Sequence, residues 1–598
     1  MTTQKIFPIN EPFYEIPQIT TFKEMIDLSE SLYSSRPAYR LRNKDGVYYE
    51  VTYKKFRHDI YYLGNSLIND GYSRAHIAVV GVSSYKWEAT YLGVTCSNNV
   101  IVPIDKELMI DNMIDIIKDS DSIMLFGDKK YVTAIEARKD ELPEGFRFCC
   151  FDNIEAEGIL KFDDYLQIGR NIYHDGNKNL SGVTVDKDAI TAILFTSGTT
   201  GVSKGVCLSQ YNICFDISSV LGVVRLNPTD SCLSVLPIHH TYECTIGFLS
   251  FITSGACISF CRGLRYIVQD MAEVKPTIFV AVPLMIEKFH ARIMKKIQDK
   301  KGGKVIFKVG KYVSKAGRAF GSKDLGRALF NEVIQTFGGR LRLIVTGASA
   351  VDPRVVEDFI TMGVDIYIGY GLTETSPLLS CTNDKLMLTN SVGTPIPGME
   401  MKIHNPDDLG VGEIWARGPV VMKGYYKNPE ATAQVFSPDG WFRTGDLGIV
   451  DEHNCYRITG RCKNVIVTKN GKNIFPEEVE LYLNNNPFIE ESMVYGEESG
   501  NDETTVSAQI YPNYEKIKEN LKRQELTQEE IRNSIAEAIK EVNKKLPNYK
   551  KIMKFDVREN EFIKTTTKKI KRQANIDEKK NAAAEKEEAG EENTETKE

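Results

Sequence analysis

The sequence predicts an α/β protein with a large N-terminal domain and a smaller C-terminal domain. Apolar strand-like runs alternate with helix-like segments through the first 180 residues and again over 341–369, whereas short strands with Gly and Pro turns follow residue 391. Such alternation is typical of parallel sheets covered by helices on both faces, and the short strands indicate a small barrel-like β subdomain. We therefore expect two doubly covered sheets and this subdomain in residues 1–459, and a small α+β domain in 460–576.

The first predicted sheet consists of apolar strands and the helices between them. Residues 75–82 form a continuous apolar run, and 99–105 and 122–126 are the next such runs. Residues 111–118 carry apolar side chains at helical spacing, and another helix passes through Trp87. Continuous apolar runs of this length indicate strands buried on both faces.

Later elements of the large domain again alternate between strand and helix. After them, short strands follow one another without helices. Residues 341–347 and 364–369 are strand-like and predict a second sheet, whereas 399–403 and 412–416 are short strands between turns. The uncharged stretch 245–261 is at the short limit for a membrane span. Its central Thr-Ser-Gly turn favours a helix followed by a buried strand.

A boundary near residue 460 begins the predicted C-terminal domain. Residues 464–467 are strand-like, and Pro476 with the two glutamates after it is typical of a first helical turn. Thr527 opens a capping box at the start of an amphipathic helix. Over 577–598 no side chain is more apolar than Ala, so we expect a disordered acidic tail there.

Composition narrows the class of protein. Hydrophobic residues make up 42% and charged residues 26% of the chain, as in ordinary globular proteins, and the net charge of -6 argues against a general nucleic-acid binder. The N-terminus lacks the apolar core of a signal peptide, and the 12 cysteines are scattered, so we expect a cytoplasmic protein. The 8 histidines form no metal-ligand spacing, and only His239 and His240 are adjacent.

One segment departs from the acidic balance of the chain. Residues 288–327 contain 13 Lys or Arg and two Asp. Such an excess is either a solvated helical face or a contact with an anionic membrane surface. The sequence leaves both open, and the second would place the protein peripherally on the inner face of the membrane.

The most specific pattern is TSGTTGVSKG, residues 196–205, directly after a buried-strand pattern. Glycine tolerates positive φ and has no side chain, so backbone N–H groups of such a turn approach an anion closely. The loop supplies these glycines, hydroxyls and a lysine: Thr196, Ser197, Gly198, Thr199, Thr200, Gly201, Lys204 and Gly205. The spacing differs from that of a Walker A loop. The pattern therefore predicts a polyphosphate-binding loop of another kind.

These residues resemble the phosphate loop of the AMP-forming acyl-adenylate enzymes, the superfamily of acyl-CoA synthetases, luciferases and adenylation domains. Residues 370–377 (YGLTETSP) resemble its adenine and magnesium motif, 440–448 (GWFRTGDLG) its ribose motif, and 460–480 its hinge segment. The resemblance extends from about residue 47 to about 572. These four motifs occur in the same order as in the superfamily, which makes the resemblance specific.

The resemblance implies a site for ATP and Mg²⁺. The glycine-rich loop would hold the β- and γ-phosphates, and Thr196 and Glu374 would coordinate Mg²⁺, a hard cation that favours oxygen ligands. Tyr370 would stack on adenine. Asp446 would accept the ribose hydroxyls, and Arg461 would donate to ribose or phosphate oxygens. Other residues implied at the nucleotide and acyl sites are Gly347, Ala348, Gly369, Gly371 and Thr373.

Three further roles follow from the resemblance. His240 would form a wall between the acyl site and the nucleotide, although a buried core histidine is the alternative. Lys463 falls on the hinge position, about which the small domain would rotate between half-reactions, although a plain surface lysine is the alternative. Gly471 marks an approach point for the pantetheine arm of CoA. The C-terminal domain is therefore expected to be mobile.

The catalytic lysine is expected within residues 562–572. The superfamily usually has Thr-Gly-Lys before Ile-x-Arg, and here Lys568 stands in place of the glycine. Alignment on Ile570 and Arg572 selects Lys569 as the residue that contacts the acyl carboxylate and the α-phosphate, and leaves Lys568 as a neighbour.

Substrate choice is indicated by segments that look most like bacterial long-chain fatty acyl-CoA synthetases. These are residues 236–243, the basic insertion after residue 283, and 337–347. A tunnel lined by small residues would suit an alkyl chain, whose burial contributes about 0.8 kcal/mol per methylene. The residues expected to line it are Gly347, Ala348 and Gly369.

Together these features predict an ATP-dependent, AMP-forming fatty acyl-CoA synthetase that forms acyl-AMP and then transfers the acyl group to CoA. Joining a carboxylate to ATP brings two anions together, so the site needs a divalent cation, cationic groups and hydrogen-bond donors. One alternative is an enzyme that delivers acyl-AMP to a carrier protein or uses another carboxylic acid. The other is a catalytically inactive acyl- or nucleotide-binding homologue, for which Lys568 is the only hint.

Overall fold

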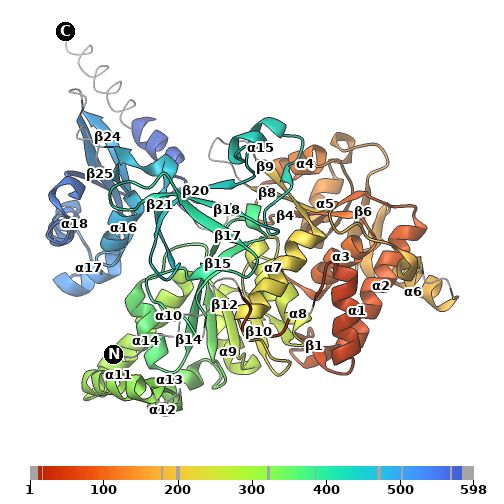
Figure 1. Ribbon diagram of the computed structural model, residues 1–598, viewed down its shortest axis with the longest axis horizontal. Coiled ribbons are helices and arrows are strands. Elements are labelled where there is room, and N and C mark those ends of the chain that lie inside the picture. Colours follow the sequence, from red (N-terminus) through yellow and green to blue (C-terminus); the bar gives the residue numbers. More distant parts are fainter. Residues whose placement is uncertain are drawn as a thin grey trace, which may run out of the picture.

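The molecule contains two large sheets, a four-stranded sheet and a separate C-terminal α+β unit. The computed structural model describes residues 11–16, 18–176, 179–196, 203–319, 324–383, 385–467, 473–499, 503–565 and 569–581. Figure 1 shows the C-terminal unit (blue) at one end, beside the two large sheets. The predicted α/β class and the order of its parts are confirmed.

The first sheet has eight strands in the order β19-β9-β8-β4-β3-β5-β6-β7. Its strands are β3 (His76–Val80), β4 (Val100–Ile104), β5 (Ser122–Gly127), β6 (Arg147–Cys150), β7 (Ile159–Lys161), β8 (Ile190–Thr196), β9 (Lys204–Ser209) and β19 (Gly424–Tyr425). Strands β3 to β8 run parallel, while β9 and β19 add antiparallel. All five residues of β4 are buried, which agrees with a strand covered on both faces.

The second sheet has nine strands in the order β16-β15-β14-β13-β12-β10-β11-β1-β2. They are β1 (Pro37–Arg42), β2 (Tyr48–Thr52), β10 (Ser231–Ser234), β11 (Cys257–Phe260), β12 (Ile278–Ala281), β13 (Leu343–Thr346), β14 (Asp365–Gly371), β15 (Leu378–Cys381) and β16 (Thr394–Pro395). Its six central strands are parallel. One continuous hydrophobic core joins residues of both sheets.

Helices precede, cover and connect these strands. They are α1 (Phe22–Tyr33), α2 (Tyr53–Asn69), α3 (Tyr85–Cys96), α4 (Ile110–Asp119), α5 (Lys129–Glu136), α6 (Phe162–His174), α7 (Gln210–Val223), α8 (Ser250–Thr253), α9 (Ile267–Val274), α10 (Pro283–Asp299), α11 (Gly303–Ala319), α12 (Asp324–Leu329), α13 (Asn331–Thr336), α14 (Pro353–Thr361) and α15 (Pro429–Val435). Helix α7 begins with a capping box between Ser209 and Asn212, which satisfies its first N–H groups.

The uncharged stretch 245–261 adopts the predicted helix and strand. A π-helix, η3 (Tyr242–Leu249), runs into α8, and β11 follows after Gly255, whose φ is 76°. Across the part of the chain that the structure describes, no helix is long and apolar enough to cross a bilayer.

The predicted β subdomain is an antiparallel sheet in the order β17-β18-β20-β21. Its strands are β17 (Glu400–His404), β18 (Gly412–Arg417), β20 (Phe442–Val450) and β21 (Tyr456–Arg461). Since β21 pairs with β20 as far as Arg461, residues 460 and 461 belong to this sheet and not to the C-terminal domain, where the sequence placed them.

The C-terminal domain has its own hydrophobic core. Its elements are β22 (Ile466–Val467), β23 (Asn473–Ile474), α16 (Pro476–Asn484), β24 (Ile489–Ser499), β25 (Glu503–Pro512), α17 (Tyr514–Leu521), α18 (Gln528–Asn543) and β26 (Lys554–Val557). The predicted capping box between Thr527 and Glu530 opens α18. The face of α18 predicted to be apolar is buried: Ile531, Ile535, Ile539 and Val542.

The predicted start of the disordered tail is corrected. Residues 572–581 are helical, Asn575 is fully buried, and Ile576 packs near Phe562. Lys579 forms ion pairs with Glu497 at 3.3 Å and with Asp556 at 2.8 Å. Polar and charged contacts therefore hold a segment whose low hydrophobicity had predicted disorder. Residues 582–598 lie outside the described residues.

Candidate active site

The site is formed where β8, β14, β20 and β21 end or pass close together. Thr196 is the last residue of β8, and Tyr370 lies near the end of β14. A short 3-10 helix, η5 (Thr373–Thr375), follows and carries Glu374. Loops after parallel strands collect at one edge of a sheet, which is where α/β proteins bind ligands.

Asp446 is the centre of a buried hydrogen-bonded group. Its side chain accepts from the Tyr370 hydroxyl at 2.9 Å through Oδ2, and Arg461 Nε lies 2.9 Å from Oδ1. Asp446 is 4% and Tyr370 8% exposed. Burial raises the pKa of Asp446, while Arg461 and Tyr370 oppose that rise. The predicted ribose acceptor thus lies between two oriented donors, and each oxygen keeps a second lone pair for a ligand.

The two strands of the phosphate loop form an antiparallel hairpin. Thr196 pairs with Lys204, and the Ser203 hydroxyl donates to the Thr196 carbonyl at 3.1 Å. Gly205, which the sequence placed in the turn, lies in β9, where an added Cβ would come within 2.9 Å of Ile193 and 3.2 Å of Tyr426. The other predicted phosphate ligands, Ser197, Gly198, Thr199, Thr200 and Gly201, lie outside the described residues.

Tyr425 connects the phosphate hairpin to the predicted Mg²⁺ ligand. Its hydroxyl donates to Glu374 Oε1 at 3.0 Å, and the Lys204 ammonium lies 5.0 Å from its ring centroid. Burial and the Glu374 carboxylate raise the Tyr425 pKa. Sequence reasoning missed this residue, because only the pairing of β19 with β9 brings it to the site.

The glycines predicted to line the acyl tunnel have packing roles. A Cβ on Gly347 would lie 2.9 Å from the Gly369 carbonyl, and one on Gly369 would lie 2.8 Å from Leu378. A Cβ on Gly371 would overlap the Pro377 carbonyl at 1.7 Å, while Ala348 has a positive φ of 71°. The three glycines allow close backbone approach at the ends of β13 and β14, and contact of Gly347, Ala348 and Gly369 with an acyl chain remains a prediction.

Lys569 brings the C-terminal domain to the site. Its charge interacts with Asp446, Glu374 and Arg461, three groups of the large domain. The side chain keeps contact with solvent, but the protein atoms packed around it, with Arg461, lower its pKa, and the two carboxylates oppose that effect. Lys568 lies outside the described residues.

Two contacts with Thr565 hold the backbone of Lys569 in this position. Its N–H donates to the Thr565 hydroxyl at 3.1 Å, and its carbonyl accepts from the Thr565 N–H at 2.7 Å. Arg572, the other anchor of the alignment, donates to both oxygens of Glu480 on α16 at 2.6 and 2.7 Å. The lysine therefore stands on a segment fixed to the C-terminal domain.

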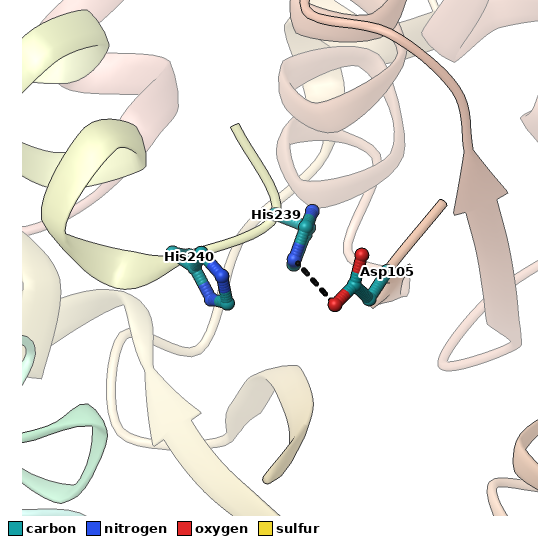
Figure 2. A group of neighbouring side chains, drawn as sticks. All are labelled: Asp105, His239 and His240. Carbon is teal, nitrogen blue, oxygen red and sulfur yellow. Dashed lines mark ion pairs between the residues drawn. The ribbon is translucent and has the colours of Figure 1, made fainter. Parts of the chain in front are cut away.

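His240 lies beside a second histidine and an aspartate, which Figure 2 shows together. The rings of His239 and His240 are 4.0 Å apart, and His239 Nε2 is 3.4 Å from Asp105 Oδ2. Burial and the neighbouring His239 lower the pKa of His240 to about 3, so it is neutral at physiological pH. A cavity of about 30 Å³ borders these residues, Thr196 and Thr373.

The predicted hinge and CoA residues lie between the domains or outside the described residues. Lys463 is in η6 (Cys462–Asn464), between β21 of the large domain and β22 of the small one. This position agrees with a connecting segment, and rotation about it is a prediction. Gly471 lies outside the described residues.

The chain matches a known family over most of its length. Residues 31–426 match the family described as AMP-binding enzyme, and residues 463–582 match the AMP-binding enzyme C-terminal domain. The second match extends to residue 582, in agreement with the helix over 572–581.

Curated relatives are similar to the chain at modest identity. Long-chain-fatty-acid–CoA ligase FadD15 of Mycobacterium tuberculosis is 27% identical over 471 residues, which are 76% of each chain. Human long-chain-fatty-acid–CoA ligase 1 is 26% identical over 527 residues, 82% of this chain and 74% of the relative. The peroxisomal long chain acyl-CoA synthetase 6 of Arabidopsis thaliana is 31% identical over 325 residues, and the match spans about half of each, 52% and 46%.

Solved structures share the fold. An anthranilate CoA ligase in complex with anthranoyl-AMP has a TM-score of 0.72 at 21% identity, covering 96% of this chain and 99% of its own. ATP-bound MatB from Rhodopseudomonas palustris has a TM-score of 0.69 at 21% identity, covering 92% and 98%. With the two family matches and the arrangement of Asp446, Glu374 and Lys569, these likenesses lead to one conclusion: the chain belongs to the AMP-binding enzyme family.

Proposed function

We propose that this chain is an ATP-dependent, AMP-forming acid–thiol ligase that converts a fatty acid, of long chain, into its CoA thioester. The observation that carries the proposal is the buried Asp446 carboxylate held by Tyr370 and Arg461, on which the charge of Lys569 from the other domain acts. The charge of a lysine in one domain therefore acts on carboxylates of the other, among the residues predicted to bind the nucleotide. The names of the curated relatives support the substrate class.

In the first half-reaction a carboxylate oxygen of the fatty acid attacks the α-phosphorus of ATP. A P–O bond to the acyl oxygen forms, the bond to the β-phosphate breaks, and pyrophosphate leaves with the electron pair. Lys569 offsets the charge of the two anions that meet, and Asp446 holds the ribose. Preorganised charges of this kind stabilise a transition state because they need no reorganisation.

Thr196 and Glu374 fit a Mg²⁺ site, because a hydroxyl and a carboxylate are the oxygen donors that this cation favours. Tyr425 orients Glu374 through one oxygen. Bound there, the cation would neutralise phosphate charge. The neutral His240 would separate the acyl carboxylate from the nucleotide without adding charge.

In the second half-reaction the thiolate of CoA attacks the acyl carbonyl, a C–S bond forms, and AMP leaves. We propose that the C-terminal domain rotates about Lys463 between the two steps and that pantetheine approaches near Gly471. The connection of the two domains through the short segment between β21 and β22 supports this.

Pyrophosphate release from a panel of acids, with and without CoA, tests the proposal. Release with long-chain acids and formation of acyl-CoA is the expected result. Accumulation of acyl-AMP that CoA does not discharge would favour delivery to a carrier protein. Release with other acids alone would change the substrate class, and no release with any acid would favour an inactive binding homologue.

We propose in addition that α11 contacts an anionic membrane surface. Val305, Ile306, Val309 and Tyr312 are apolar side chains that α11 exposes, at 66%, 55%, 53% and 69%. Lys304, Lys308 and Lys315 are exposed beside them. Figure 1 shows α11 at an outer edge of the molecule. An amphipathic helix with lysines next to apolar residues is typical of interfacial binding.

Some basic residues of the segment 288–327 form ion pairs within the protein and do not belong to the proposed membrane-binding face of α11. Lys311 pairs with Asp358 at 2.6 Å and Arg318 with Asp365 at 3.0 Å, so these two are structural. Sedimentation with vesicles that contain phosphatidylserine tests the contact. Ile306→Asp should reduce binding at least tenfold, whereas Leu409→Asp, at another exposed site, should not. Equal binding of both variants would contradict the contact.

A further inference from the structure

Three potential metal ligands from distant parts of the chain lie together beside the active site. Asp105 directly follows β4 of the first sheet, whereas His239 and His240 lie in the connection between β10 of the second sheet and η3. One donor atom from each lies within 4.8 Å of the others. Figure 2 shows the three side chains gathered at the junction of the two sheets, with His239 facing Asp105.

The separations are those of ligands around a small cation. His239 Nε2 and Asp105 Oδ2 are 3.4 Å apart, which is longer than the usual N–H···O hydrogen bond. Two ligands of a tetrahedral Zn²⁺, with bonds of about 2.0–2.1 Å, lie about 3.3 Å apart. A donor atom of His240 lies within 4.8 Å of both.

The two imidazoles have ring nitrogens that the protein leaves unsatisfied. Nε2 of His239 and Nε2 of His240 are buried and have no hydrogen-bond partner among the described residues, and His239 is 8% exposed. A buried polar atom without a partner destabilises the folded chain. Coordination of a cation would use both nitrogens at once.

Space for a further ligand lies next to the three residues. The adjoining cavity of about 30 Å³ is bordered by Asp105, His239, His240 and Thr196, and a water needs roughly 10–15 Å³ measured in this way. A cation held by three protein ligands would therefore have an open position for water, as catalytic but not structural zinc sites have.

We propose that Asp105, His239 and His240 bind a borderline divalent cation such as Zn²⁺, and that this cation inhibits formation of acyl-AMP. Two imidazoles and one carboxylate suit Zn²⁺, whereas Mg²⁺ favours oxygen ligands. The site is therefore chemically distinct from the Thr196 and Glu374 pair. A bound cation would fix His240 and add positive charge to a group on which the charge of Lys569 acts.

The inhibition rests on the proposed function, but the binding does not, so the two are tested separately. The full-length chain, freed of metal, is titrated with Zn²⁺ against a chromophoric chelator, and with Co²⁺, whose visible absorption reports tetrahedral nitrogen and oxygen ligation. The variants are His239→Ala and Asp105→Asn. The matched control is His290→Ala, since His290 is another part-buried histidine, but one whose Nε2 already contacts Asp358 at 2.8 Å.

We expect one tight site in the wild-type chain and in the His290 variant. The affinity for Zn²⁺ should fall by about 10–100-fold or more in the His239 and Asp105 variants. A loss of about 10–100-fold is typical when a residue that only hydrogen-bonds a metal ligand is changed. Equal affinity in all four proteins would mean an adventitious cation only, and would overturn the proposal. Melting temperatures in metal-free buffer show whether each variant is folded. If His239→Ala does not fold, the affinity of Asp105→Asn alone decides whether the three residues bind the cation.

The activity arm compares acyl-AMP formation with saturating Mg²⁺, with and without one equivalent of Zn²⁺. Zn²⁺ should slow the wild-type chain at least tenfold and the His239 and Asp105 variants less than twofold. Binding without slowing would overturn the inhibition. If no acid is activated by any of the proteins, the proposed function fails, and the chelator and Co²⁺ titrations still decide whether the site exists.

Discussion

At the scale of single residues, the site depends on partners far apart in the chain. Asp446 is oriented by Tyr370 and Arg461, and Glu374 by Tyr425. Burial disfavours the charge of Asp446, and its hydroxyl and guanidinium donors offset that cost. Removal of one member should therefore leave a buried partner unsatisfied as well as weaken ligand binding.

Asp446→Ala should lower kcat/KM for ATP about ten- to a hundredfold. The ribose loses a charged acceptor, and hydrogen bonds to charged groups contribute about 1.5–3 kcal/mol. Initial rates of pyrophosphate release against ATP concentration measure this. The control is Glu400→Ala on β17, an exposed carboxylate paired with Arg417, which should leave ATP dependence unchanged. An unchanged ATP dependence in Asp446→Ala would remove this residue from the nucleotide site.

Glu243 should make stability depend on pH. It is buried, accepts from the Ser234 hydroxyl at 2.6 Å, and burial raises its pKa to about 8. The folded chain keeps a proton on Glu243 that the unfolded chain releases above about pH 4.5. The contribution of Glu243 to the free energy of unfolding is therefore fully present below that pH and is lost as the pH rises towards 8.

Glu243→Gln stays neutral and lacks this titration. Its melting temperature should therefore rise relative to that of the wild-type chain between pH 5 and pH 8, while Glu357→Gln, at an exposed position of α14, should follow the wild-type profile. Thermal unfolding at four pH values measures the difference. Parallel profiles for all three proteins would show that Glu243 is ionised in the folded state.

At the scale of elements, short connections position the chemistry. The hairpin of β8 and β9 holds both ends of the phosphate loop, and β19 adds Tyr425 to its edge. The helix over 572–581 contacts the segment that precedes Lys569. Asn575 on this helix donates to the Ile563 carbonyl and accepts from the Ile563 N–H, both at 2.9 Å.

Truncation after Gln573 should lower the melting temperature by roughly 5–10 °C and reduce acyl-AMP formation. It removes buried Asn575, Ile576 and the ion pairs of Lys579, and each kcal/mol corresponds to about 2–8 °C in domains of this size. Calorimetry and pyrophosphate release measure both effects. Truncation after Asn581 is the control and should match the full-length chain. Equal stability of the two truncated proteins would show that this helix contributes nothing.

At the scale of the whole molecule, two domains with separate hydrophobic cores share one site. Lys569 belongs to the small domain, yet it interacts with carboxylates and an arginine of the large one. The connection between them is the short segment after Arg461. This arrangement suits an enzyme that presents different faces of one domain in two successive steps.

Lys569→Ala should slow acyl-AMP formation about 10²–10³-fold, the scale for removal of one preorganised donor. Supplied with synthetic acyl-AMP and CoA, the same variant should form thioester at a near-normal rate, because rotation would carry this lysine away. Single-turnover assays of each half-reaction separate the two steps. Lys568→Ala, the matched neighbour, should leave both within a few fold.

Two outcomes would contradict this account of the domains. A severe defect in Lys568→Ala with little effect of Lys569→Ala would shift the alignment by one residue. Equal damage to both half-reactions in Lys569→Ala would mean that the domains do not alternate.

The sequence by itself determined the order of elements and the residues that bear the chemistry. Apolar runs such as 99–105 and the capping box at Thr527 predict strand and helix through local burial and hydrogen bonding. The motif positions of Asp446 and Glu374 were likewise readable, since side-chain chemistry and spacing are local properties of the chain.

Only the tertiary structure decided which residues meet. Tyr425 reaches Glu374 through strand pairing, Asp105 reaches His239 across two sheets, and the charge of Lys569 acts on Asp446 across two domains. The helix over 572–581 has too few apolar residues to be predicted from composition, and contacts with Glu497 and Asp556 hold it. Such contacts depend on the packing of segments far apart in the chain, which no local pattern encodes.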